Sequence, residues 1–103
     1  YSVEEAVRVG NEYAKAQYGV TIDTSMTTAD SSYYPGTADS VARLTEHGGQ
    51  AALNAAVCGN VDATFACLAA LDNADVVSAY ARFNCTVRYN AAGDEYIVVV
   101  LYG

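Results

Sequence analysis

The fold of this chain is decided by its last quarter, VSAYARFNCTVRYNAAGDEYIVVVLY (residues 77–102). Up to Tyr89, apolar side chains alternate with polar ones. The apolar set is Val77, Ala79, Ala81, Phe83, Cys85, Val87 and Tyr89; the other set is Ser78, Tyr80, Arg82, Asn84, Thr86 and Arg88. A period of two indicates a strand with one buried face and one face in water. We therefore predict a strand over 77–89, with Phe83 buried and Arg82 and Arg88 in solvent.

A second strand is predicted directly after the first. Residues 90–94 hold Asn, Gly and Asp in a stretch of hairpin length. Residues 96–102 are apolar on both faces, which is typical of an interior strand or of one that another element covers. The chain should therefore end in a β-hairpin.

The N-terminus predicts a helix over residues 3–18. Ser2 and Glu5 have the spacing of a capping box, in which Ser2 accepts from the Glu5 amide and Glu5 reaches back. Apolar or small residues then recur at helical spacing, and Gly19 supplies a stop.

Between these ends the pattern is weaker. Residues 20–22 favour a short strand, and residues 23–32 are rich in Asp, Thr and Ser, which favours a loop. Residues 37–47 are compatible with a short helix whose Val41 and Leu44 point inward.

An Ala- and Leu-rich region follows over residues 50–71. It is either one helix or two short helices that break at Gly59-Asn60, with Asp62 as a cap for the second. Because it is apolar nearly all round, we expect it to be the most buried element. Together these elements predict an α+β fold in one domain over 1–103: the N-terminal helix and the Ala-rich helical region pack on a small antiparallel sheet that ends in the C-terminal β-hairpin.

Composition excludes some classes of partner. The 103 residues carry a net charge of −7 and only five Lys and Arg. Nucleic-acid binders and proteins on anionic membranes need clustered cations, so neither partner is expected. No apolar run has the length for membrane insertion. The chain opens at Tyr1 without an initiator Met or a signal peptide, which favours a processed form or a piece of a longer chain. The Lys-poor composition, rich in Tyr, Thr, Ser and Asp, favours a secreted or cell-surface protein.

Three cysteines allow one disulfide and one free thiol. Suppose that the helical region packs antiparallel to the first hairpin strand. Cys85 then lies about 30 Å beyond Val76 along the strand. Measured back from Asp72 along the helix, Cys58 is about 21 Å away and Cys67 only about 8 Å, so Cys58 comes nearer to Cys85. We predict a Cys58–Cys85 disulfide with Cys67 as a buried free thiol; three buried free thiols are the alternative.

No catalytic, cofactor or metal motif is present. The cysteines lack the C-x₂₋₄-C spacing of zinc sites. Several loop Asp residues suit calcium, but no D-x-[DN]-x-[DN]-G loop occurs, so no cofactor is expected. The candidate binding surface is formed by Tyr33, Tyr34 and His47, the only histidine. We therefore expect a non-catalytic binding or interaction module with an unidentified protein or glycan partner.

Residues 11–20 (NEYAKAQYGV) resemble the first helix of the CAP superfamily (cysteine-rich secretory, SCP-like), which reads N-x-x-R-x-x-x-G-[LV]. Residues 96–101 resemble the end of such domains. Ala14 stands in the place of the family's Arg, the Asn-to-Gly spacing is one residue longer, and one histidine cannot build the family's paired His/Glu cavity. The resemblance implies, as an alternative, an enzyme-like domain that uses His47 with an acidic partner. A third possibility is a structural subunit of a surface assembly, whose apolar last strand pairs with a neighbour.

Overall fold

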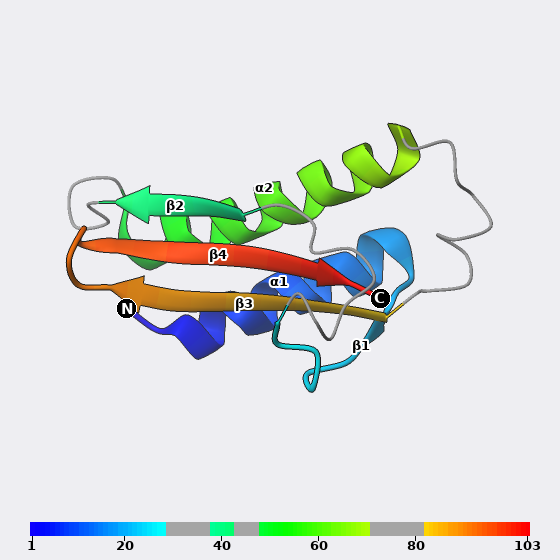
Figure 1. Ribbon diagram of the computed structural model, residues 1–103, viewed down its shortest axis with the longest axis horizontal. Coiled ribbons are helices and arrows are strands. Elements are labelled where there is room, and N and C mark those ends of the chain that lie inside the picture. The colour runs from blue at the N-terminus through cyan, green and yellow to red at the C-terminus, as the bar shows by residue number, and fades with distance from the viewer. Residues whose placement is uncertain (29–37, 43–47, 71–81) are drawn as a thin grey trace.

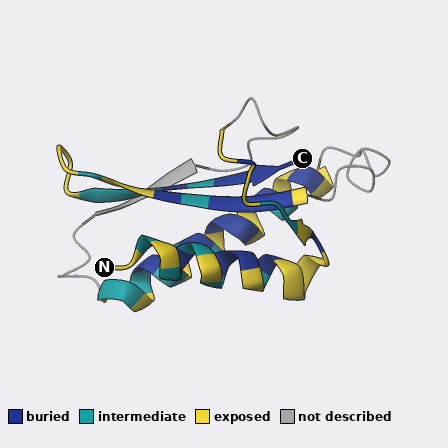
Figure 2. Cartoon of the chain, turned by 90° about the horizontal axis from the view of Figure 1, so that it is seen from below, coloured by how far each residue is buried: buried dark blue, intermediate teal, exposed yellow. Residues whose placement is uncertain are grey.

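The computed structural model describes residues 1–28, 48–70 and 82–103, and the backbone of residues 38–42. Its elements are α1 (Val3–Tyr18), β1 (Thr21–Ile22), β2 (Ala38–Ala42), α2 (Gly49–Ala70), β3 (Arg82–Asn90) and β4 (Glu95–Tyr102). The strands form one sheet in the order β1-β3-β4-β2 (Figure 1). Both helices lie on the same face of this sheet, so the described fold has two layers (Figure 2).

The predicted α+β class is confirmed, with one correction to the sheet. β2, β4 and β3 are antiparallel, but β1 runs parallel to β3, with Thr21 opposite Arg82, so the sheet is mixed. Two residues carry too little pattern to reveal a strand's direction. The direction of β1 is set instead by the chain reversal at the end of α1, which returns the chain beside the start of β3.

The predicted bounds of α1 are confirmed at both ends. The Ser2 hydroxyl accepts from the Glu5 N–H at 3.0 Å, which satisfies one of the free amides of the first turn. Gly19 takes the left-handed conformation at φ 69°, and its N–H donates to the Lys15 carbonyl. A residue with a Cβ would be strained there.

Only half of the predicted capping box forms. The Glu5 carboxylate does not reach back to Ser2, because it pairs with Arg8 at 2.7 Å. The Ser2 N–H donates instead to the Gln50 side chain of α2 at 2.7 Å, and the Gln50 amide donates to the Ser2 carbonyl at 3.0 Å. The start of α1 is therefore tied to the start of α2.

The Ala-rich region forms a single helix, α2, which continues through Gly59-Asn60. The Asn60 amide donates to the Ala56 carbonyl, and the Thr64 hydroxyl donates to the Asn60 carbonyl, both at 2.9 Å, so these polar side chains are satisfied without a break. The expectation that this would be the most buried element is wrong. One face is buried and the other is exposed, because small alanines let a helix look apolar all round without needing cover.

The helix that the sequence predicted over 37–47 is contradicted by β2. Residues 38–42 pair antiparallel with β4, from Ala38 opposite Val99 to Ala42 opposite Glu95. So short a segment shows no clear periodicity that would distinguish a helix from a strand. It forms a strand because the backbone N–H and C=O groups along the edge of β4 need hydrogen-bond partners. Residues 29–37, 43–47 and 71–81 lie outside the described residues, and with them parts of the predicted loop and of the predicted 77–89 strand.

The predicted hairpin is confirmed over its described length. β3 and β4 pair from Phe83 opposite Tyr102 to Asn90 opposite Glu95. Phe83, Cys85 and Val87 are buried, whereas Arg82 and Arg88 are exposed, as the alternation predicted. β4 has β3 on one edge and β2 on the other. From Glu95 to Val99 the last strand is therefore paired on both edges, which leaves no free edge over this stretch for a neighbouring chain.

The core lies between the helices and the sheet. It is formed by side chains from α1, α2, β3 and β4, chiefly Ala6, Ala14, Leu53, Val57, Val61, Phe83, Cys85, Val98, Val100 and Tyr102.

The layers approach closely at Gly10 of α1. A Cβ built there would lie 2.3 Å from Cγ1 of Val57 and 3.0 Å from Sγ of Cys85. Only glycine fits this position without a shift of its neighbours.

Replacing Gly10 with alanine is expected to destabilise the fold. Overpacking costs about 1–3 kcal/mol, which exceeds the gain in helix propensity of about 1 kcal/mol over most of that range. Gly59→Ala is the matched control, because a Cβ there meets nothing within 4 Å and should stabilise α2. Urea unfolding should move the two midpoints in opposite directions; two equal upward shifts would contradict the close approach at Gly10.

Candidate functional site

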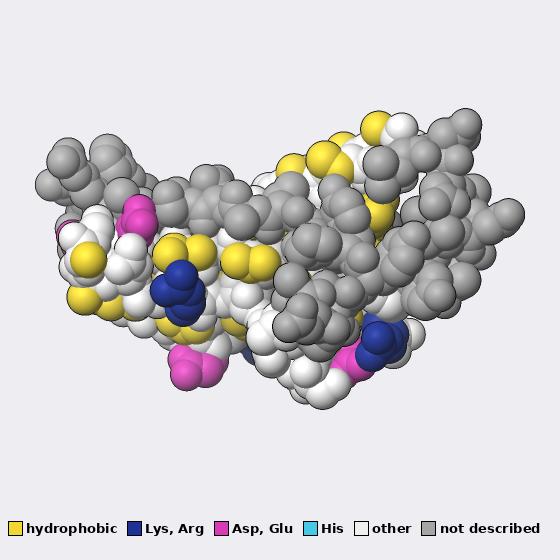
Figure 3. All heavy atoms as spheres, viewed as in Figure 1, with side chains coloured by type: hydrophobic (Ala, Val, Ile, Leu, Met, Phe, Trp, Pro, Cys, Tyr) yellow, Lys and Arg dark blue, Asp and Glu magenta, His cyan; other side chains and the backbone are white. Residues whose placement is uncertain are grey.

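The outer face of the sheet, opposite the helices, carries a groove of about 330 Å³. It is lined by residues of β3, β4 and the segment after β1: Thr27, Thr28, Thr86, Val87, Arg88, Ile97, Val99 and Leu101. Figure 3 views this face and shows apolar side chains gathered beside a cationic one. The site arises because β4 is apolar on both faces, so that one set enters the core and the other set faces outward.

One wall of the groove is built by the turn that follows β1. The Asp23 carboxylate accepts from the Ser25 N–H at 3.0 Å and from the Ser25 hydroxyl at 2.5 Å, and it pairs with Arg82 at 2.7 Å. The bonds from Ser25, and then the bond from Arg82, lower the pKa of Asp23. The turn aims the chain back over the sheet, where Met26 is buried and Thr27 and Thr28 reach the groove.

A buried pair of asparagines holds this turn against β3. The Asn84 amide donates to the Met26 carbonyl at 2.9 Å, and its oxygen accepts from the Asn11 amide at 2.9 Å. The Asn11 oxygen accepts from the Cys85 N–H at 3.0 Å. β1 ends opposite Phe83, so Asn11 supplies the partner that a longer β1 would have given to Cys85.

The sequence pattern did not predict this pair. The alternation with Phe83 and Cys85 predicts a wet face for Asn84, whereas Asn84 is buried in the structure. A signal was nevertheless present at Asn11, which lies at helical spacing between Val7 and Ala14 on the inward face of α1. A polar side chain on such a face needs a buried partner, because an unpaired one is costly.

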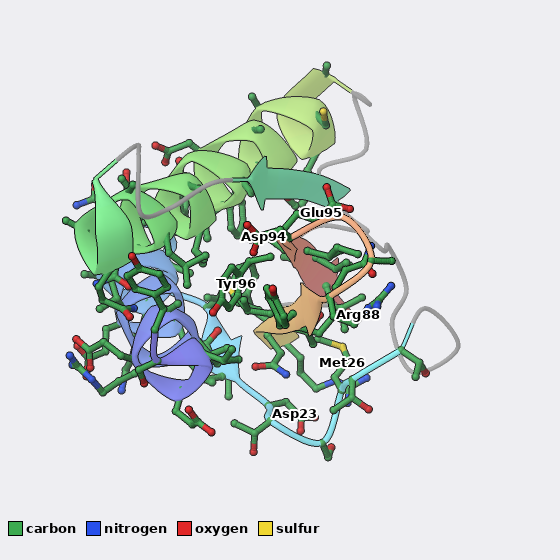
Figure 4. The ribbon with its side chains drawn as sticks, turned by 90° about the vertical axis from the view of Figure 1, so that its left-hand side faces the viewer. Asp23, Met26, Arg88, Asp94, Glu95 and Tyr96 are labelled. Carbon is green, nitrogen blue, oxygen red and sulfur yellow. The ribbon has the colours of Figure 1, made fainter. Side chains whose placement is uncertain are left out.

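Arg88 stands at one end of the groove. It lies opposite Ile97 in the β3–β4 register, and its side chain points away from the helices, on the same side as Met26 (Figure 4). The other described arginines, Arg8 and Arg82, are each bound by carboxylates. Within the described part of the chain, Arg88 has no ion pair.

Aromatic side chains gather at the hairpin end of the sheet. The ring of Tyr96 lies 6.2 Å from that of Tyr1, edge to face, and 5.0 Å from that of Tyr89. Tyr1 and Tyr89 are 55% and 49% exposed, so this cluster reaches the surface. The Tyr89 hydroxyl donates to Asp94 at 2.8 Å, and this bond raises the Tyr89 pKa.

A separate pair of tyrosines on α1 joins this helix to α2. The hydroxyls of Tyr13 and Tyr18 both donate to the carboxylate of Asp62, at 2.8 Å and 2.6 Å. This hydrogen bond, together with desolvation, raises the pKa of Tyr18 to about 12. Asp62 would have capped a second helix segment under the two-helix alternative. Because α2 is one helix without a break, Asp62 lies in its middle and accepts the bonds of the two tyrosines there.

All three cysteines are free thiols, so the predicted Cys58–Cys85 disulfide is not formed. Cys85 is buried, as its strand face predicted, and Cys58 is half-buried. Cys67 is exposed, and the expectation of a buried thiol there is wrong. It lies near the end of α2 on the helix's outer face, where the prediction had assumed burial all round.

The thiols should differ sharply in their reactivity toward iodoacetamide. Burial, with a smaller effect of Cys58, raises the pKa of Cys85 to about 12, so its thiolate is scarce as well as covered. Burial also raises the pKa of Cys58. Because the thiolate is the reacting form, Cys67 should be alkylated first, Cys58 more slowly, and Cys85 only after unfolding. Peptide mapping over time measures this order; modification of native Cys85 as fast as Cys67 would contradict the burial.

The predicted surface of Tyr33, Tyr34 and His47 lies outside the described residues. Among those that are described, no three His, Cys, Asp or Glu side chains gather in a way that suits a metal ion, calcium included. The sequence predicted no apolar run of the length needed for membrane insertion, but one described helix, α2, is long and apolar enough by length and composition to cross a membrane. The core helix of a soluble protein passes the same test, and 33% of the apolar window of α2 is buried within the fold.

No protein-family model, curated protein or solved structure matches this chain. The resemblance of residues 11–20 to the CAP superfamily therefore rests on those residues and on the closing strand alone.

Proposed function

We propose that this chain is a non-catalytic binding module that holds its ligand in the groove on the outer face of the sheet. One observation carries the proposal: β4 presents apolar side chains to both sides of the sheet, and the described helices, α1 and α2, cover only one side. A strand of this kind normally has cover on both faces. Leu101 is buried near the turn that holds Met26, but Ile97 and Val99 remain only half-buried along the groove.

The dimensions suit a small ligand. Ligand pockets range from about 300 to 1,000 Å³, and a groove of about 330 Å³ lies at the lower end of that range. A pocket of this type combines an apolar lining with a few polar groups that fix orientation. Here the apolar part comes from β4, and the polar groups are threonine hydroxyls and one guanidinium.

The lining favours binding over reaction. It contains no carboxylate, imidazole or thiol among its described residues, and nucleophilic or acid–base catalysis draws on such groups. The location outside the cell, at a surface or in a secreted form, belongs to the same proposal and rests on composition. Fractionation of the source organism, with an antibody against this chain, tests that location.

The groove is tested with a neutral apolar probe, 1-octanol, and methyl NMR. Saturable shift changes are expected at Ile97, Val99 and Leu101, which line the groove, and not at Val57 or Val61 in the core. Val99→Phe should fill the groove and abolish the changes. Ala63→Phe, on the exposed face of α2, is the matched control and should leave them intact. Absence of saturable changes in the wild type, or equal changes throughout the core, would overturn the proposal.

A further inference from the structure

The groove carries a second signal, which concerns the charge of its ligand. Arg88 lines one end of the groove, is exposed, and has no ion pair within the described part of the chain. The chain has twelve Asp and Glu against five Lys and Arg, so acidic partners are plentiful. Arg8 has two of them and Arg82 has one. A cation at the mouth of an apolar groove that pairs with none of the described carboxylates can meet an anionic ligand.

The described acidic side chains at the hairpin end of the groove have other hydrogen-bond partners. On the outer face, Glu95 lies opposite Asn90, next to Arg88 along the hairpin, and its carboxylate accepts from the Asn90 amide at 3.1 Å. Asp94 accepts from the Tyr89 hydroxyl at 2.8 Å. Both carboxylates lie at the hairpin end, beyond Arg88, where Figure 4 shows them on the turn side of the sheet. They would repel a second negative group that extended in this direction.

The remainder of the groove leads away from the charges. From Ile97, which faces Arg88, the floor continues through Val99 to Leu101. Four strand residues span roughly 13 Å. The wall along this path is formed by Thr27 and Thr28. The path thus offers apolar contact over its length and a guanidinium at one end only.

We propose that the groove binds an amphipathic monocarboxylate, with the carboxylate on Arg88 and the apolar body along Ile97, Val99 and Leu101. The inference rests on the proposed function of the groove and adds the chemical class of its ligand. An arginine presents a planar fork that matches a carboxylate with two parallel hydrogen bonds. Burial of the apolar body on β4 supplies the remaining affinity.

The experiment compares sodium octanoate with 1-octanol, which has the same chain length and no charge, by methyl NMR titration. The wild type should bind octanoate more tightly by about tenfold, a ratio that corresponds to about 1.4 kcal/mol. Arg88→Gln should reduce octanoate affinity to that of octanol and leave octanol affinity unchanged. Lys15→Gln changes the net charge by the same amount on the exposed side of α1, and should keep the preference.

The outcomes separate the two proposals. Equal affinity for both probes in the wild type, or an octanoate preference that survives in Arg88→Gln, would overturn the carboxylate inference and leave the groove as a binding site. Failure of both probes to shift Ile97, Val99 and Leu101 would overturn the groove itself. Loss of the preference in Lys15→Gln would assign it to the net charge of the protein and would also overturn the role of Arg88.

Discussion

Replacing Phe83 with alanine is expected to lower the free energy of unfolding by about 3–5 kcal/mol. Phe83 is fully buried in β3, at the position that pairs with Ile22 of β1. Its ring stacks near that of Phe65 of α2, with centroids 5.8 Å apart, and Phe65 also meets Tyr102 edge to face at 5.7 Å. Truncation would remove the ring and leave a cavity where both layers meet, and a rigid surrounding core fills such a cavity only in part.

The measurement is urea unfolding followed by circular dichroism. Tyr89→Ala is the matched control, because it removes an aromatic ring from the same strand and the same face at a position that is 49% exposed. It should cost clearly less than Phe83→Ala. If the alanine variant proves too unstable to purify, Phe83→Leu should still show a reduced midpoint. A midpoint for Phe83→Ala equal to that of the wild type would show that the core described for this strand is wrong.

Replacing Asn11 with alanine is the second change with a large expected effect. Asn11 is 5% exposed and Asn84 is 4% exposed, so their bonds are made away from water. The substitution leaves the Asn84 oxygen and the Cys85 N–H without their partner. A buried polar group left unsatisfied costs about 1–3 kcal/mol, so the two together should cost about 2–6 kcal/mol. The gain in helix propensity offsets less than about 1 kcal/mol of this loss.

Amide exchange gives this prediction a local readout. The Cys85 N–H should exchange faster in Asn11→Ala than in the wild type by more than the global loss of stability explains. Gln17→Ala is the control, since it removes a similar side chain from an exposed position of α1. It should leave both stability and Cys85 exchange nearly unchanged. An Asn11→Ala variant as stable as Gln17→Ala would refute the buried network.

The elements with a strong period could be predicted from the sequence. α1 has a cap, a stop and many helical repeats between them, and its predicted bounds are the observed ones. The hairpin has a long alternation followed by turn residues. β2 has neither: its five residues become a strand because β4 offers an unpaired edge, which is a tertiary cause that no local pattern records. In α2 the helix could be predicted but its burial could not, because alanine is common on both buried and exposed helix faces.

The candidate site predicted from the sequence rested on side-chain type. Tyr33, Tyr34 and His47 lie outside the described residues. The groove has an ordinary composition of Thr, Val, Ile and Leu. The sequence feature that pointed to the groove was the last strand, which is apolar on both faces. This pattern predicts that something covers each face, but it does not identify what covers the outer face. The orientation of Arg88 beside Ile97 required the register of the hairpin.

The short length of β1 has a consequence for aggregation. A sheet edge with unpaired N–H and C=O groups is a template for a strand of another chain. β1 protects β3 only as far as Phe83, and Asn11 then occupies the next outward N–H, that of Cys85. An added strand would pair with this edge but would present a new unpaired edge on its other side. The amide side chain of Asn11, which is fixed on a helix, accepts from the N–H group without creating a new edge. Asn11 therefore extends the protected part of this edge by one N–H group, from Phe83 to Cys85.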